Sequence, residues 1–151
     1  MVELKRILLV EDSANDVELT LAAFAKHNLV NEVMVVRDGE EALDLLCRRG
    51  KYEVLPAGNP ELILLDLKMP KVDGLEVLRQ VRANEKLKLI PVIVLTTSSE
   101  QQDIIQSYEL GVNAFVVKPV DFEQFVEAVR EIGLFWAVLN QPPPGSIKRG
   151  E

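Results

Sequence analysis

The sequence has little of several features that would direct it to particular classes of protein. Its 151 residues include a single cysteine, which excludes an internal disulfide and a cysteine zinc cluster and fits a reducing compartment. No apolar run reaches the ~18 residues of a membrane span, and the first residues lack the pattern of a secretory signal peptide. We therefore expect a cytoplasmic protein without a membrane partner.

Positive charge is also scarce. Lys and Arg number 17 against 24 Asp and Glu, the formal net charge is −7, and no run is rich in Lys or Arg. A chain of this kind does not bind nucleic acid or anionic lipid through its overall charge. We expect no nucleic-acid partner, and a protein partner that recognises shape or one small site.

Five short apolar runs alternate with stretches of helical periodicity. The length allows one domain, and the alternation predicts an α/β fold of five βα units around a parallel sheet. The runs are almost continuously apolar, as strands covered on both faces should be. The predicted strands are 7–10, 33–36, 62–65, 92–95 and 114–117, and the predicted helices are 15–26, 40–49, 75–83, 100–110 and 122–139.

Other segments are assigned from composition. The domain is expected to span residues 5–139, with a surface loop at 51–60 that carries proline and glycine. A proline-rich stretch at 141–145 ends the last helix, so residues 140–151 are expected to form a disordered C-terminal tail. Cys47 falls in a predicted helix and is interpreted as a packing residue.

Polar side chains follow four of the five predicted strands. Residues just past the carboxyl ends of parallel strands gather at one rim, where ligands bind. Three close carboxylates repel one another unless a cation or a proton relieves them, and oxygen ligands suit Mg²⁺. A solvated loop explains any one of these residues, but not the whole set. The set comprises Glu11, Asp12, Asp66, Thr96, Thr97 and Lys118, which precedes Pro119.

These residues resemble the motifs of the receiver domains of two-component response regulators. Asp66 and Thr96 are 30 residues apart and Thr96 and Lys118 are 22 apart, which is similar to the chemotaxis regulators of this family. The resemblance covers residues 5 to 139 and implies a flavodoxin-like (βα)₅ receiver domain with strand order 2-1-3-4-5 and helices on both faces. The motifs are Glu11-Asp12, Asp66 to Pro70, Asp73-Gly74, Thr96 to Ser98 and Lys118-Pro119.

The resemblance implies a phosphorylation switch and not an enzyme that releases a product. Asp66 would accept a phosphoryl group from a histidine kinase or a small acyl phosphate. The only reactions of the protein would be the Mg²⁺-dependent phosphorylation and dephosphorylation of this residue. Thr96 and Lys118 would contact the phosphoryl oxygens, and Mg²⁺ would offset their charge. The metal ligands would be Glu11, Asp12, Asp66 and the backbone carbonyl of Lys68.

Switching and phosphoryl lifetime depend on positions that vary within the family. Phe115 stands where the chemotaxis regulator has a rotating tyrosine, and it cannot donate a hydroxyl hydrogen bond. Movement of Thr96 with Phe115 would change the face formed by the fourth helix, the fifth strand and the fifth helix. Lys68 and Ser98 stand where the family tunes hydrolysis, and we expect a phosphoryl group that outlasts that of the chemotaxis regulator.

Within the family, the chain is similar to small stand-alone regulators of phytochrome-type histidine kinases. This narrower resemblance rests on Leu64 to Leu67, Val94 to Ser98, Ser107 to Leu110 and Phe135-Trp136. It implies a phytochrome-type sensor kinase as the partner upstream. With no output segment recognised, a downstream protein partner is also expected.

The last predicted helix has more apolar residues than a sheet-covering stripe needs. Leu134, Phe135 and Val138 fall off the stripe. Either the end of the helix folds back on its own domain, or this region, with the fourth helix and fifth strand, forms a homodimer or partner surface. The stripe itself comprises Phe122, Phe125, Val126, Val129, Ile132, Trp136 and Leu139.

Other interpretations fit less well. Phosphatases with an aspartate nucleophile commonly have a second aspartate where this chain has Lys68. A receiver fold that only binds a partner would have lost its function while it retained Asp12, Asp66, Thr96 and Lys118. Nucleotide binding is disfavoured because no glycine-rich phosphate loop follows the first strand. Asp16 and Asp103, near helix starts, are interpreted as capping and dipole charges.

Overall fold

Five parallel strands form one sheet in the order β2-β1-β3-β4-β5, which confirms the flavodoxin-like arrangement. The computed structural model describes residues 3–26, 29 and 32–149. The first, second, third and fifth strands have the predicted bounds, and the fourth strand is one residue longer than predicted. They are β1 (Ile7–Val10), β2 (Val33–Val36), β3 (Leu62–Leu65), β4 (Val92–Thr96) and β5 (Ala114–Val117).

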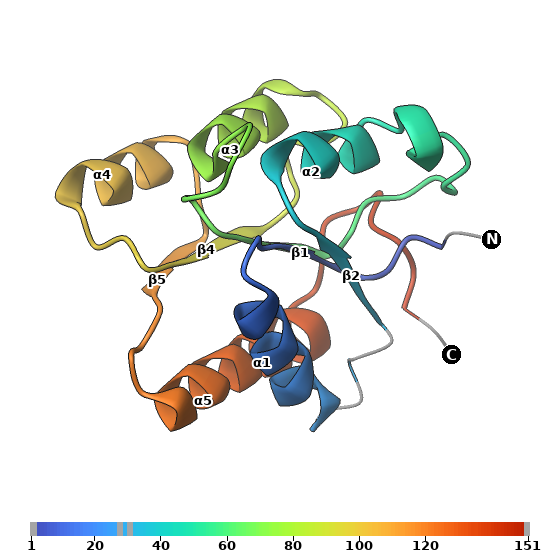
Figure 1. Ribbon diagram of the computed structural model, residues 1–151. Helices are drawn as coiled ribbons and strands as arrows, with labels where there is room; N and C mark the ends of the chain where they lie inside the picture. Colours follow the sequence, from blue (N-terminus) through green and yellow to red (C-terminus); the bar gives the residue numbers. More distant parts are fainter. Residues whose placement is uncertain (1–2, 27–28, 30–31, 150–151) are drawn as a thin grey trace.

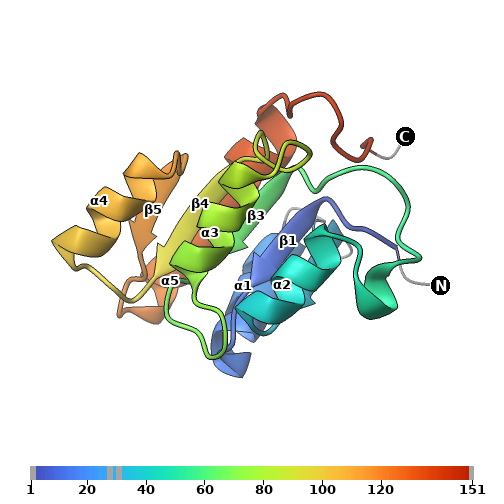
Figure 2. The ribbon, with the colours of Figure 1, turned by 90° about the horizontal axis from the view of Figure 1, so that it is seen from above.

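Helices cover both faces of the sheet. In Figure 1, α1 and α5 lie on one face and α2, α3 and α4 on the other, and Figure 2 shows the latter three side by side. Within the described residues, no helix has the length and apolar character needed to cross a membrane. The helices are α1 (Ala14–Ala25), α2 (Gly39–Leu46), α3 (Gly74–Ala83), α4 (Gln101–Glu109) and α5 (Phe122–Ile132).

Side-chain caps fix where four of the helices begin. The side-chain oxygens of Ser13, Asp38, Asp73 and Asp121 each accept a hydrogen bond from the N–H three residues further on. Each cap lies in a loop that follows a strand, so the caps hold these loops at the rim where the carboxyl ends of the strands meet.

The core consists of two layers, one on each face of the sheet. Alternate residues of β1 enter opposite layers: Leu8 and Val10 pack with α2 and α3, whereas Ile7 and Leu9 pack with α1 and α5. The strands β1, β3 and β4 are buried along their whole length, whereas the edge strands β2 and β5 are only partly covered. The rim is therefore carried by rigid central strands.

The last helix departs from the predicted α-helix after Ile132. It continues as a π-helical segment, η3 (Gly133–Leu139). A Cβ at position 133 would lie 2.5 Å from Phe24 Cε1, so the glycine allows α1 to approach closely. The wider turn brings Ala137 to the core beside Gly133, and both are buried.

The two ends of the predicted core stripe are exposed, which corrects that prediction. Phe122 is 61% exposed and Leu139 is 67% exposed. The cause is length, since a helix of about 18 residues at ~1.5 Å per residue is longer than strands of four or five residues at ~3.3 Å. The middle of the stripe packs in the core, namely Phe125, Val126, Val129, Ile132 and Trp136.

Residues 140–149 follow a defined path along the domain, which corrects the expectation of disorder for these residues. Positions 150–151 of the expected disordered tail lie outside the described residues. Asn59 N–H donates to the Gly145 carbonyl (3.0 Å), and Ile147 N–H donates to the Asn59 carbonyl (2.7 Å). Arg149 Nε donates to Glu61 Oε1 at 2.8 Å. Composition could not reveal this buried carboxylate as a partner.

The loop at 51–60 and Cys47 also carry detail that was not predicted. A 3₁₀ turn, η2 (Gly50–Tyr52), opens the loop, and Tyr52 and Leu55 are buried in the core.

Cys47 is exposed, although it was expected to pack. It is the residue at the C-terminal cap of α2, past the buried stripe of that helix.

Candidate functional site

Three carboxylates meet at the rim formed by the carboxyl ends of β1 and β3. Glu11, Asp12 and Asp66 each offer one carboxylate oxygen, and these oxygens lie within 4.8 Å of one another. Glu11 and Asp66 are buried, at 3% and 6% exposure, whereas Asp12 is exposed. The cluster therefore opens to solvent on the side of Asp12.

Lys118 brings an ammonium into this cluster from the end of β5. Its backbone N–H donates to the Thr96 carbonyl at 2.7 Å, which extends the pairing of β4 and β5 to this residue. Its Nζ lies 2.6 Å from Glu11 Oε1 and 3.6 Å from Asp66 Oδ2, and the side chain is 5% exposed. The structure thus brings together the predicted residues of three strand ends.

The charges at the rim are not balanced. Burial raises the pKa of Glu11 to about 7, and the charge of Asp66 adds to this, while Lys118 opposes it. Desolvation lowers the pKa of Lys118, but hydrogen bonds to Asp16 and Glu11 outweigh it and leave that pKa raised. One ammonium does not neutralise the carboxylates, so the site favours a further cation.

The donor set fits a hard divalent cation. Carboxylate oxygens are the ligands that Mg²⁺ and similar ions prefer, and Mg²⁺ uses one or two carboxylates together with water. The exposed side of Asp12 leaves room for water or for a phosphoryl oxygen. The residues present are therefore suited to such an ion.

Thr96 lies at the end of β4 with its side chain fully buried. Its Oγ1 accepts a hydrogen bond from the Ser98 N–H at 3.3 Å. The Ser98 hydroxyl donates to Asp103 Oδ2 at 2.6 Å, which connects this loop to the first turn of α4. Thr96 is thus coupled to the helix that follows it.

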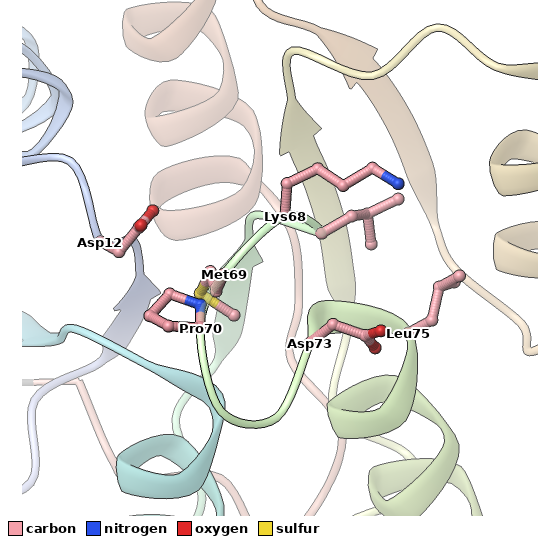
Figure 3. Close-up of a pocket in the computed structure, with 7 residues that line it drawn as sticks. Asp12, Lys68, Met69, Pro70, Asp73 and Leu75 are labelled. Atoms are coloured by element: carbon pink, nitrogen blue, oxygen red, sulfur yellow. The ribbon is translucent and has the colours of Figure 1, made fainter.

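Lys68 does not point its ammonium into the carboxylate cluster. The Lys68 side chain extends away from Asp12 (Figure 3), and its Nζ lies 3.2 Å from Asp103 Oδ2. The hydrogen bond from Ser98 lowers the pKa of Asp103, with a further contribution from Lys68. Lys68, Ser98 and Asp103 therefore join the loop after β3 to the start of α4.

A pocket of about 380 Å³ opens beside Asp12 (Figure 3). The loop between β3 and α3 forms most of its wall. This loop ends at Gly74, where a Cβ would lie 2.3 Å from the backbone oxygen of Asp66. The lining residues are Asp12, Leu67, Lys68, Met69, Pro70, Asp73 and Leu75.

Sequence reasoning missed three charged residues at this site. Asp16 contacts Lys118, and Asp103 contacts Lys68, although both were interpreted as helix-terminal charges. Arg37 donates from Nε to the Glu11 carbonyl (3.1 Å) and from Nη2 to the Asp12 carbonyl (2.7 Å). The position of Arg37 directly after β2, at the same rim, was the signal that could have identified it.

The response regulator receiver domain family matches residues 7–130 of the chain. Among curated proteins, the response regulator Rcp1 of Synechocystis sp. is 44% identical over 132 residues, covering 87% of this chain and 88% of Rcp1. The solved Mn²⁺-bound form of Rcp1 has a TM-score of 0.86 at 42% identity and covers 92% of this chain and 99% of that one.

Two other solved structures are similar over most of their length. The phosphorylated cyanobacterial phytochrome response regulator RcpA has a TM-score of 0.86 at 42% identity, covering 92% of this chain and 98% of that one. The bacteriophytochrome response regulator RtBRR has a TM-score of 0.73 at 62% identity, covering 95% of this chain and 86% of that one.

Proposed function

The chain belongs to the response regulator receiver family, and we propose that Asp66 is the residue on which it accepts a phosphoryl group. Members of this family are phosphorylated by histidine kinases and signal by the resulting change of state. The observation that carries the assignment is that buried Asp66 shares one cluster with Glu11 and Asp12. Lys118 lies 3.6 Å from its Oδ2.

The transfer is a displacement at phosphorus. An oxygen of Asp66 attacks, an O–P bond forms, and the P–N bond to the kinase histidine breaks, after which the imidazole takes up a proton. The Lys118 ammonium and the Thr96 hydroxyl contact the phosphoryl oxygens. These donors lower the repulsion between two anionic reactants.

The divalent cation at this site is Mg²⁺ in our proposal. Glu11, Asp12 and Asp66, with the backbone carbonyl of Lys68, are the residues that would hold it. When bound, the ion neutralises charge on the carboxylates and on the phosphoryl oxygens. The existence of an Mn²⁺-bound form of Rcp1 supports a divalent cation in this family.

The switch runs from Thr96 to the surface formed by α4, β5 and α5. Thr96 moves toward the phosphoryl group, and Phe115 follows by a change of packing alone. Two hydrogen bonds support this path: the Ser98 N–H donates to Thr96 Oγ1, and the Ser98 hydroxyl donates to Asp103 on α4. A shift at Thr96 therefore acts directly on the start of α4.

Lys68 and Ser98 set the lifetime of the phosphoryl group. Their contacts with Asp103 hold the two loops beside Asp66 together. A closed arrangement hinders attack by water on the phosphorus. The phosphoryl group then outlasts that of a chemotaxis regulator.

The upstream partner is a histidine kinase of the phytochrome type, and the output passes to a downstream protein. The names of RcpA and RtBRR support the phytochrome association. The exposed side chains of Leu134, Phe135 and Val138 support a homodimer or partner surface in the region of α4, β5 and α5. The receiver domain spans residues 5–139, and residues 140–149 pack along it. It acts in the cytoplasm, and it gains and loses a phosphoryl group only on Asp66.

Incubation with acetyl phosphate followed by intact mass spectrometry tests the proposal. The protein should gain one phosphoryl group when Mg²⁺ is present and none in EDTA. Asp66→Asn should gain none, while the matched variant Asp44→Asn, on the exterior of α2, should behave as wild type. Labelling of Asp66→Asn at the wild-type level would refute the assignment.

A further inference from the structure

Lys118 has a second, partly buried contact that the phosphoryl-transfer proposal does not use. Its Nζ lies 2.8 Å from Asp16 Oδ2, which is closer than Asp66 Oδ2 at 3.6 Å. Asp16 is on the first turn of α1, and its side chain is 22% exposed. The ammonium therefore donates to Glu11 and Asp16, and its distance to Asp66 exceeds that of a hydrogen bond.

The position of Asp16, three residues after Ser13, would also allow it to cap the start of its own helix. In a capping box, the side chain three residues after the cap accepts from the backbone N–H of the cap residue. Here the Ser13 N–H donates to Glu11 Oε2 at 3.1 Å instead. The Asp16 carboxylate is thus directed to Lys118, 102 residues away in the sequence, and not to the end of its own helix.

We propose that Asp16 is a positioning residue that holds the Lys118 ammonium away from Asp66 while Asp66 carries no phosphoryl group. The inference rests on the proposed role of Asp66. Asp16 lies outside the cluster of Glu11, Asp12 and Asp66, so it holds the ammonium away from Asp66 without being a metal ligand itself, while the ammonium keeps its hydrogen bond to Glu11.

The contact has two consequences of opposite sign. Without Asp16, the ammonium can approach Asp66 and compete with a divalent cation for its oxygens. Once a phosphoryl group is present, its oxygens compete with Asp16 for the same ammonium. Loss of Asp16 should therefore weaken the binding of a metal alone and strengthen the binding of a phosphoryl mimic.

The first test is titration with Mn²⁺ alone, followed by calorimetry, on the full chain. Asp16→Ala should bind Mn²⁺ about fivefold more weakly than wild type, because the ammonium gains access to Asp66. Asp16→Asn keeps a neutral acceptor for the ammonium and should show a smaller loss. Glu18→Ala, an exposed residue of the same helix, is the control for a change of charge and should stay within about twofold.

A double-mutant cycle separates this role from a general effect of charge. In the Lys118→Met background, Asp16→Ala should change Mn²⁺ affinity no more than Glu18→Ala does. An equal loss with and without Lys118 would overturn the proposal, as would wild-type affinity in Asp16→Ala. Thermal unfolding of each variant verifies that it is folded, and Asp16→Asn replaces Asp16→Ala if the latter is not.

The second test uses trifluoroberyllate as the phosphoryl mimic at saturating Mg²⁺. Asp16→Ala should bind the mimic more tightly than wild type and Glu18→Ala do. Damage to the site would instead weaken the binding of both Mn²⁺ and the mimic. Weaker binding of the mimic would contradict the proposal. Failure of acetyl phosphate to label wild-type Asp66 would instead refute the proposed function, and the Mn²⁺ titrations do not depend on that labelling.

Discussion

The two ends of the central strands each hold a buried glutamate, but in different electrostatic settings. At the amino ends, Glu61 is fully buried between Arg6 (3.1 Å) and Arg149 (2.8 Å). Arg6 also pairs with Glu32 (2.5 Å), so two guanidiniums balance two carboxylates. At the carboxyl ends, Glu11 shares one ammonium, that of Lys118, with Asp16 and Asp66.

The difference separates a structural group of ion pairs from the proposed binding site. Each oxygen of Glu61 has its own guanidinium, so this group holds the C-terminal segment to the sheet. The Glu11 cluster remains short of positive charge, and burial holds the pKa of Glu11 at about 7. A buried cluster of carboxylates that shares one ammonium is suited to an incoming cation.

The largest effect is expected when the balance of charge at the amino ends of the strands is disrupted. Glu61→Ala removes one of the two carboxylates that pair with the buried guanidinium of Arg6 and frees Arg149, so it should lower the free energy of unfolding by about 3 kcal/mol. Urea unfolding measures the loss. Glu53→Ala, an exposed glutamate, should stay within about 0.5 kcal/mol of wild type. A loss equal to that of Glu53→Ala would mean that the pairs with Glu61 contribute nothing.

A metal ion should stabilise the protein through the carboxylates at the carboxyl ends of the strands, and not through Glu61. Mn²⁺ at a hundredfold excess over its dissociation constant should stabilise the folded protein by about 2.7 kcal/mol. Glu61→Ala should retain this gain, because its site for the metal is intact, whereas Asp12→Ala should lose most of it. Thermal unfolding with and without Mn²⁺ gives the comparison, and an undiminished gain in Asp12→Ala would contradict the proposed ligands.

The pH dependence of stability should also distinguish the two ends. The folded pKa of Glu11 is raised from its ordinary value to about 7, so its contribution to stability is present at low pH and is lost as the pH rises through 7. In EDTA, Glu11→Gln should therefore match wild type near pH 5 and exceed it by about 2 kcal/mol near pH 8. Urea unfolding at the two pH values measures this, and a variant that is less stable at pH 8 would reverse the sign of our account.

The smallest effect concerns Lys68, which is half exposed. Lys68→Asn removes its ion pair with Asp103 and should shorten the phosphoryl half-life by about two- to fivefold, or about 0.5–1 kcal/mol. The decay is followed by mass spectrometry after removal of acetyl phosphate, with Lys86→Asn as a surface control. An unaltered or longer half-life would count against a role of Lys68 in lifetime.

Features that depend on local sequence could be predicted. The strand bounds follow from short apolar runs, and the helix starts follow from caps such as Ser13 and Asp121. The cluster of Glu11, Asp12 and Asp66 followed from the rule that parallel strands end at one rim.

Features that depend on contacts between distant residues could not be predicted. The π-helical segment requires the close approach of Phe24 to Gly133. The ordered C-terminal segment requires Arg149 to reach Glu61, 88 residues earlier. Asp16 fits a helix cap in the sequence, and only the folded chain shows that Lys118 is its partner.

The most direct test of the central claim locates the phosphoryl group itself. Borohydride reduction of the protein after acetyl phosphate treatment converts an aspartyl phosphate to homoserine, which peptide mass spectrometry assigns to one position. We predict homoserine at position 66 in wild type, and none when Mg²⁺ is removed. Homoserine at position 12 or 16, or unmodified residue 66 in labelled protein, would contradict it.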